Sequence, residues 1–316
     1  MDDEIKTKIF NKNNIEKAAE LIAKGEIVAF PTETVYGLGA NALDAEAVKK
    51  IFKAKKRPQD NPLIVHVTGM EEVEKLGHIT DDALKLTNAF WPGPLAIILK
   101  KKDVIPSEVT ANLDTAAFRM PNHEVALKLI KLSNKPIAAP SANISGRPSS
   151  TNFEHVYEDL NGRVAGIIKH DESEIGIESS VVDLTTKPPT LLRPGGVSLE
   201  QLKEIIPSIK FYNGGATNKS PGMKYKHYSP KAKIVLFEMS SENNIEEFRE
   251  EVEKKGLKVK ILKLENTKNC SHELFDQFRE LDKKKTNFIL IKAIPEEGLG
   301  LAIMNRVRKA ATIIKK

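Results

Sequence analysis

Residues 13–30 read NNIEKAAELIAKGEIVAF, and this stretch predicts a helix, a turn and a strand in succession. Asn13 is suited to cap the helix, because Glu16 follows it at the spacing of a capping box. Gly25 is placed to end the helix, and Ile27–Phe30 is typical of a short buried strand. The apolar residues of one helical face recur with the helical period: Ile15, Ala18, Ala19 and Ile22. A helix with one apolar face next to a buried strand favours a sheet covered by helices.

The same alternation of helix and strand continues to about residue 206 and predicts an α/β domain. Helices are expected after Asp44, which is placed to cap the first of them, and over about 71–90, 124–133 and 199–206. Strands are expected at Pro62–Val67, Leu95–Lys100, Ala116–Arg119, Pro136–Ala139, Gly166–Lys169, Ser180–Leu184 and Thr190–Arg193. Because the links between these strands are irregular, we expect a mixed sheet rather than a purely parallel one.

Residues 212–230, YNGGATNKSPGMKYKHYSP, interrupt this pattern with many glycine and proline turn signals. We therefore expect a first domain at 1–211, a linker at 212–230 and a second domain at 231–316. The linker also carries Tyr225, His227 and Tyr228, which a plain spacer does not need, and long loops without regular structure are often functional.

The pattern restarts after the linker. Strand-like runs lie at Lys233–Glu238, Lys258–Leu264 and Asn287–Ile294, and helical patterns cover about 244–255, 271–283 and 299–312. These elements predict a smaller C-terminal domain built as a three-layer α/β sandwich.

Composition places the 316 residues among ordinary globular proteins, with 40% hydrophobic and 29% charged residues. The N-terminus does not resemble a signal peptide, and no apolar run approaches membrane-spanning length. The single cysteine, Cys270, excludes an internal disulfide, so a cytoplasmic protein is expected. The net charge of +6 is explained equally well by solubility or by an anionic partner such as nucleotide phosphates or RNA.

The common nucleotide and hydrolase motifs are missing from the sequence. It contains no phosphate-binding P-loop, no complete G-x-G-x-x-G, no HExxH and no G-x-S-x-G. A nucleotide would therefore have to be bound in another way.

Three segments have the chemistry of a binding site. FPTETVYGLGAN at 30–41 places hydroxyls and a carboxylate after a strand, although a capped strand-to-helix turn explains it too. KAKKRP at 53–58 concentrates cations at a helix end, where one or two would satisfy the helix dipole and four suggest a polyanion. APSANISGRPSST at 139–151 offers small donors directly after a strand, where α/β sheets bind ligands, whereas the alternative is a surface loop.

Several single residues lie at predicted strand ends beside these segments. Arg119 and Arg193 each end a strand, where an arginine can bind a carboxylate or phosphate, and Glu178-Ser179-Ser180 precedes another strand. Asn61 and His66 follow the cationic segment, although an isolated histidine on a strand is more often simply packed.

Together the segments resemble the YrdC/YwlC family of threonylcarbamoyl-AMP synthases, in its long form with an extra C-terminal domain. The family's K-x-R corresponds to Lys55-Lys56-Arg57, and its S-x-N corresponds to Ser141-Ala142-Asn143. Further blocks are similar to the family pattern: PTETVYGLGANA, RPQDNPLIVHV, FWPGPL, SGRPS, GIESSVVD, LLRPG, and for the long form PGMKYKHYSP and GLGLAIMNRVRKA. The resemblance covers about residues 15–312.

The resemblance implies a YrdC-like twisted mixed sheet with a basic concave pocket, and it implies residue roles. L-Threonine would be bound by Thr34, Asn61, His66, Arg119, Ala139 and Ser179. ATP would be bound by Lys55, Arg57, Thr115, Ser141, Asn143, Ser149, Arg193 and Tyr225, with Lys55 and Arg57 acting as the catalytic cations. Tyr225 would belong to a lid that excludes water.

The resemblance further implies a nucleotidyltransferase that forms threonylcarbamoyl-AMP and pyrophosphate from L-threonine, bicarbonate or CO2, and ATP. Mg²⁺ would accompany the ATP, and the product would pass to a tRNA threonylcarbamoyl transferase; direct contact with tRNA is left open. Two other functions are considered: a non-catalytic RNA-binding protein, which the low aromatic content of 6% does not favour, and a kinase-type enzyme, which lacks its motifs.

Overall fold

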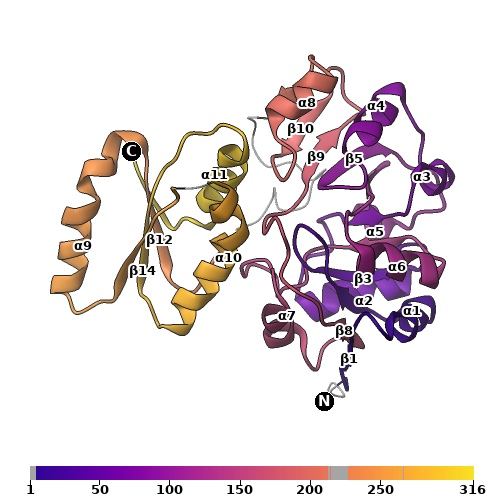
Figure 1. Cartoon of the computed structure of the whole chain (residues 1–316), viewed down its shortest axis with the longest axis horizontal. Coiled ribbons are helices and arrows are strands. Elements are labelled where there is room, and N and C mark those ends of the chain that lie inside the picture. The colour runs from indigo at the N-terminus through magenta and orange to yellow at the C-terminus, as the bar shows by residue number, and fades with distance from the viewer. Residues whose placement is uncertain (1–4, 213, 215–226, 266) are drawn as a thin grey trace.

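The computed structural model describes residues 5–212, 214, 227–265 and 267–316, which form two α/β units side by side (Figure 1). The larger unit contains an eleven-stranded sheet, and the smaller one contains a four-stranded sheet. Every helix in the described part of the chain falls short of the length and apolar composition that a membrane crossing needs.

The strands of the large sheet mix parallel and antiparallel pairs, as the irregular links predicted. Their order across the sheet is β1-β8-β2-β3-β7-β4-β6-β5-β9-β10-β11. The strands are β1 (Lys8–Phe10), β2 (Val28–Phe30), β3 (Gly37–Asn41), β4 (Ile64–His66), β5 (Leu95–Lys100), β6 (Thr115–Arg119), β7 (Ile137–Ala139), β8 (Gly166–Ile168), β9 (Ser180–Asp183), β10 (Thr190–Arg193) and β11 (Lys210–Phe211). For example, β4 pairs parallel with β6 and antiparallel with β7.

Helices cover the two faces of this sheet unequally. The helices are α1 (Ile15–Ala23), α2 (Ala45–Lys55), α3 (Met70–Leu76), α4 (Asp81–Phe90), α5 (Ser107–Thr110), α6 (Glu124–Ser133), α7 (Phe153–Leu160) and α8 (Leu199–Ile205). One face carries the main core, to which α2, α3, α4, α7 and α8 contribute. On the other face, α1 and α6 pack over β1, β8, β2 and β7, whereas β4, β6, β5, β9 and β10 share a separate small cluster without a helix. This second half of the face is where a site can form.

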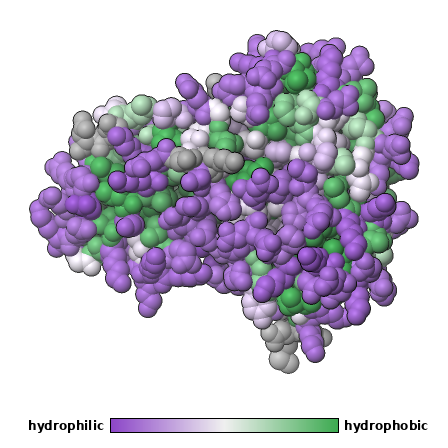
Figure 2. Space-filling view, viewed as in Figure 1, coloured by the Kyte–Doolittle hydropathy of each residue, from purple (hydrophilic) through white to green (hydrophobic). Residues whose placement is uncertain are grey.

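The C-terminal unit is the three-layer domain that the sequence predicted. Its parallel strands run in the order β13 (Val259–Leu262), β14 (Phe288–Lys292), β12 (Lys233–Phe237) and β15 (Ile313–Lys315). A 3-10 turn, η1 (Met239–Asn244), leads into α9 (Ile245–Lys254) on the outer face, and α10 (Thr267–Lys283) and α11 (Leu299–Ala310) lie on the face toward the larger unit (Figure 1). Apolar side chains gather on the visible surface of this domain beside α9 (Figure 2).

Three sequence expectations for the elements were wrong. Asn14, not Asn13, is the N-cap of α1, and its side chain accepts a hydrogen bond from the Asn11 N–H instead of capping the helix. The helical pattern at 71–90 is split, because Thr80 caps a new helix by accepting from the Ala83 N–H. GLGAN is strand β3 in the middle of the sheet rather than part of a turn. Six short elements were missed, including α7, although its apolar residues recur with the helical period: β1, β11, β15, α5, α7 and η1.

Candidate active site

A cavity lies on the open half of the sheet face, where segments from many elements converge. Strands β4 and β6 place His66 beside Arg119, since these two residues are register partners. The linker end closes the cavity from the side of the C-terminal domain, where the Tyr228 ring stacks on Phe275 of α10. The lining residues come from distant parts of the chain: Thr32, Thr34, Val35, Tyr36, Gly37, Arg57, Ile64, His66, Arg119, Ala139, Pro140, Ser141, Glu178, Ser179, Arg193, His227 and Tyr228.

The end of α2 delivers two buried cations to the site. Lys55 is the last residue of the helix, and its Nζ donates to the backbone carbonyls of Ser141 and Asn143. Lys56 adopts the left-handed conformation with φ of 52°, which turns the chain so that Arg57 reaches the cavity. Burial, and next the charge of Arg57, lower the pKa of Lys55 well below its ordinary value. An anion bound beside Lys55 would favour its charged form.

Arg57 remains a cation despite its burial. Its Nη2 donates to the carbonyls of Asn61 and Pro62, at 3.2 and 3.3 Å. Burial lowers the pKa of Arg57 to about 10, while Tyr228 opposes this shift and Arg193 adds to it. Within the described residues, Arg57 Nε and Asn61 Nδ2 are buried without a hydrogen-bond partner. Because buried polar atoms are nearly always satisfied, these two point to a bound molecule.

The cavity also contains a neutral histidine and, beside it, an ion pair. Burial, and next the charge of Arg119, lower the pKa of His66 to about 3, so its ring is uncharged at neutral pH. Arg119 Nη2 lies 2.7 Å from Glu33 Oε2, with angles outside those of a hydrogen bond, and both side chains are buried. Thr34 lies next to this pair, and its hydroxyl is 2.9 Å from the Thr32 hydroxyl.

The loop from Pro140 to Asn152 is held in shape by its own polar side chains. Ser141 Oγ donates to Asn143 Oδ1 at 2.6 Å, and Asn143 Nδ2 donates to the carbonyls of Ile144 and Arg147. The Ser149 hydroxyl donates to the Glu178 carboxylate at 2.5 Å. The residues of this loop are all buried or half-buried, so the alternative of a surface loop is wrong.

Glu178 and Arg193 close the far end of the cavity. Arg193 donates from Nε and Nη2 to the Ser179 carbonyl, at 3.0 and 2.9 Å, and from Nη2 to the Ser179 hydroxyl. Burial raises the pKa of Glu178, but Arg306, Arg193 and the Ser149 hydroxyl together lower it below its ordinary value. Glu178 is therefore an anion that balances part of the positive charge around it.

The structure brings most of the predicted site residues together. Eight of them line the cavity: Thr34, Arg57, His66, Arg119, Ala139, Ser141, Ser179 and Arg193. Lys55, Asn61, Asn143 and Ser149 are buried and contact this lining or its loop. Thr115 begins β6, four residues and about 13 Å along the strand from Arg119, and does not line the cavity. Tyr225 lies outside the described residues.

Sequence reasoning gave no role to several residues that the site contains. Thr32, Glu33 and Tyr36 belong to a segment already singled out, but sequence alone did not show that Glu33 pairs with Arg119. His227 and Tyr228 were noted only as unusual linker residues. Arg306, from α11, was not recognised, because its contact with Glu178 joins residues 128 positions apart.

Comparisons with known proteins identify the family of the chain. A family model described as telomere recombination matches residues 20–195, and one described as the C-terminal domain of threonylcarbamoyl-AMP synthase matches residues 197–312. The threonylcarbamoyl-AMP synthase of Pyrococcus abyssi is 48% identical, with 94% of each chain covered. That of Bacillus subtilis is 45% identical, with 98% of this chain and 95% of the relative covered.

A solved structure is similar along its whole length. The crystal structure of P. abyssi Sua5 complexed with L-threonine matches with a TM-score of 0.94 and 45% identity, covering 98% of this chain and all of the other. The fold and these relatives agree over nearly the entire sequence. The chain belongs to the Sua5/YrdC family of threonylcarbamoyl-AMP synthases, in the long form that carries the additional C-terminal domain.

Proposed function

We propose that this chain is a threonylcarbamoyl-AMP synthase, an adenylyl-transferring enzyme that uses L-threonine, bicarbonate or CO2, and ATP. The observation that carries the proposal is the single cavity in which Arg57 and Arg193 face Arg119 and His66. Such a cavity has cations for phosphates at one side and a polar clamp for an amino acid at the other. The relatives named threonylcarbamoyl-AMP synthase support this assignment at 48% and 45% identity.

L-Threonine binds on the side of His66 and Arg119 in this proposal. The Arg119 guanidinium binds the carboxylate of the amino acid, exchanging part of its contact with Glu33. His66, which is neutral, offers a hydrogen bond without adding charge. Thr34, Ser179, Asn61 and the backbone of Ala139 complete the clamp, and the unpartnered Asn61 Nδ2 fits a substrate acceptor. The related P. abyssi structure is described as complexed with L-threonine.

The proposed reaction forms a P–O bond and breaks another. The threonine amine adds to CO2 and loses a proton, which gives a carbamate. A carbamate oxygen attacks the α-phosphorus of ATP, the α–β bridging bond breaks, and pyrophosphate leaves with the electron pair. Lys55, Arg57 and Arg193 stabilise the phosphate charge, and the threonine clamp positions the nucleophile. The carbamate is already anionic, so this second step needs no strong base.

Mg²⁺ enters the proposal as the partner of the triphosphate. The described residues contain no group of three or more histidine, cysteine, aspartate or glutamate side chains that would hold a metal by themselves. Glu33 and Glu178 are both engaged with arginines. A magnesium ion bound mainly by phosphates and water fits this donor set, and it would supply additional charge neutralisation.

The remaining parts of the proposal concern location and partners. The chain acts in the cytoplasm, which the lone Cys270 favours, and its product passes to a tRNA threonylcarbamoyl transferase. The product is an activated anhydride that water would hydrolyse, so Tyr225, which lies outside the described residues, is proposed to help exclude water from it. The alternative of a non-catalytic RNA-binding protein does not explain a buried amino-acid clamp. Direct contact with tRNA is not needed for the reaction.

Pyrophosphate release tests the function. The purified chain with ATP and Mg²⁺ should release pyrophosphate only when both L-threonine and bicarbonate are present. Leaving out either one should reduce release to background, since neither alone provides the carbamate nucleophile. Pyrophosphate release that does not require L-threonine would contradict the proposal. So would the absence of release when all components are present.

A further inference from the structure

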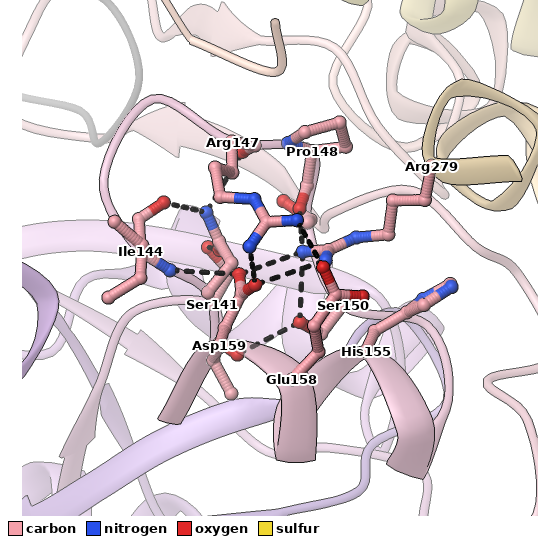
Figure 3. Close-up of polar contacts among 12 residues, drawn as sticks. Ser141, Ile144, Arg147, Pro148, Ser150, His155, Glu158, Asp159 and Arg279 are labelled. Carbon is pink, nitrogen blue, oxygen red and sulfur yellow. Dashed lines mark hydrogen bonds and ion pairs between the residues drawn. The ribbon is translucent and has the colours of Figure 1, made fainter. Parts of the chain in front are cut away.

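A buried aspartate lies under the loop from Pro140 to Asn152. The Asp159 side chain, on α7, is fully buried, and its Oδ2 accepts the Ile144 N–H of the loop at 3.1 Å. Its Oδ1 also accepts from Arg147 of the same loop (Figure 3). Asp159 therefore connects the loop to the helix that follows it.

Arg279 reaches the same aspartate from the other domain. It belongs to α10, is 2% exposed, and donates from Nη2 to Asp159 Oδ2 at 2.9 Å and from Nη1 to Asp159 Oδ1 at 3.2 Å (Figure 3). The same Nη2 donates to the Pro148 carbonyl at 2.6 Å. One planar guanidinium thus holds the helix and the second half of the loop together, in a bidentate geometry that a lysine would reproduce only in part.

The remaining contacts of the loop show what Arg279 keeps in place. Ser149 follows Pro148 directly and donates to Glu178 inside the cavity. Ser150 comes next; its hydroxyl donates to the Ala142 carbonyl at 2.9 Å, and its own carbonyl accepts the Tyr36 N–H at 2.8 Å. A shift of the Pro148 carbonyl would therefore move residues that face the cavity.

We propose that Arg279 is a positioning residue for the nucleotide, and that the C-terminal domain thereby completes the ATP site of the first domain. Through Asp159 and the Pro148 carbonyl it fixes the loop in the shape in which Ser141, Asn143 and Ser149 face the nucleotide. This inference rests on the proposed function, since it requires that the loop bind ATP. Arg279 itself touches no substrate. Among the described residues, Arg119 and His66 make no hydrogen bond to residues 148–152, so we expect the affinity for L-threonine to depend less on Arg279 than the affinity for the nucleotide does.

Isothermal titration of the full chain with an ATP analogue that has a methylene bridge between the α- and β-phosphates, and separately with L-threonine, tests the inference. Arg279→Gln should weaken binding of the analogue by at least about tenfold, because small displacements of positioning groups have effects of this size. Its affinity for L-threonine should change less than its affinity for the analogue. Arg279→Lys keeps the charge but reaches fewer acceptors, so it should weaken nucleotide binding by an intermediate factor. If Arg279→Gln does not fold, the measurement on Arg279→Lys replaces it.

His272→Ala is the matched control. His272 lies two turns earlier on α10 and also contacts the first domain, where its Nδ1 is 2.9 Å from the Ser173 carbonyl, outside the loop. This variant should bind both ligands like the wild type. Equal losses for nucleotide and threonine in the Arg279 variants, no loss for either, or the same nucleotide loss in His272→Ala would overturn the inference. If the wild type itself binds no nucleotide, the proposed function fails first, which is a different result.

Discussion

Three consecutive basic residues at the end of α2 differ in burial. This difference decides which of them can interact with a molecule in the cavity. Lys55 and Arg57 are buried beside the cavity, whereas Lys56 between them is exposed. The sequence predicted the cluster and its polyanion chemistry from the concentration of charge. It could not predict the left-handed turn at Lys56 that sends its neighbours to the site, because the conformation depends on where the chain must go next.

Removing the guanidinium of Arg57 should slow the reaction at the phosphate. Arg57→Ala should lower kcat/KM for ATP by about 10²-fold or more, by analogy with the loss of other groups that stabilise transition-state charge. Pyrophosphate release at varied ATP measures this. Lys56→Asn is the control, since asparagine tolerates the left-handed conformation and the variant removes an exposed cation from the same tripeptide. Equal losses in both variants would mean that net charge, rather than the position of Arg57, is what matters.

The burial of His66 should make the free energy of unfolding depend on pH. In the unfolded chain its pKa returns to the ordinary value near 6.5, and in the folded protein it is about 3, so the unfolded state binds more protons between these values. The unfolding free energy should therefore fall as pH drops, by up to about 1.4 kcal/mol per pH unit for this residue. Urea unfolding from about pH 7 to about pH 4 should show a shallower fall for His66→Asn. His78→Asn, at an exposed histidine, should leave the fall unchanged.

At the scale of the element, the periodicity of apolar residues predicted most helices and strands. One strand, which contains two glycines, was not predicted. The amphipathic pattern found α6 at its observed bounds and β5 and β10 likewise. Strand β3 was missed because Gly37 and Gly39 resemble turn residues. The glycines have another cause: a Cβ on Gly39 would lie 2.6 Å from Ile137 Cγ2 and 2.8 Å from the Phe30 ring. Neighbouring strands fill the space of a side chain, which no local pattern in the sequence reveals.

A side chain at Gly39 should therefore destabilise the sheet. Gly39→Ala should lower the unfolding free energy by about 1–3 kcal/mol, the usual cost of overpacking a rigid core. Gly69→Ala is the control, because its backbone is extended and nothing lies within 4 Å of its added Cβ, so it should stay within about 0.5 kcal/mol of the wild type. Urea unfolding of both variants measures the difference. Two equal values would contradict a role for the contact with Ile137.

At the scale of the whole molecule, sequence predicted two α/β units but not how they act on each other. Arg279 and Arg306, from α10 and α11, each reach a buried carboxylate of the first domain, Asp159 and Glu178. In the sequence these arginines look like ordinary residues of amphipathic helices. Their partners lie 120 and 128 positions away, and the residues meet only where α10 and α11 pack against the first domain.

The contact between Arg306 and Glu178 should couple the stability of the two domains. Arg306 Nε lies 3.1 Å from Glu178 Oε2, and the Arg306 side chain is fully buried. Arg306→Met should lower the unfolding free energy by about 3–5 kcal/mol, since it leaves a buried carboxylate without its main partner. The single tryptophan, Trp91, lies in the first domain, so its fluorescence would report a loss there that was caused by a residue of α11.

A second substitution separates the ion pair from simple packing. Adding Glu178→Gln to Arg306→Met removes the stranded charge, so the double variant should be more stable than Arg306→Met alone, with an interaction energy of about 0.5–3 kcal/mol in the cycle. Additive losses would mean that Arg306 acts through its contacts with Pro194 and the Tyr228 ring instead. The carboxylate that this arginine neutralises also lines the cavity. In the proposed function, this pair therefore makes the second domain part of the electrostatic environment of the phosphates.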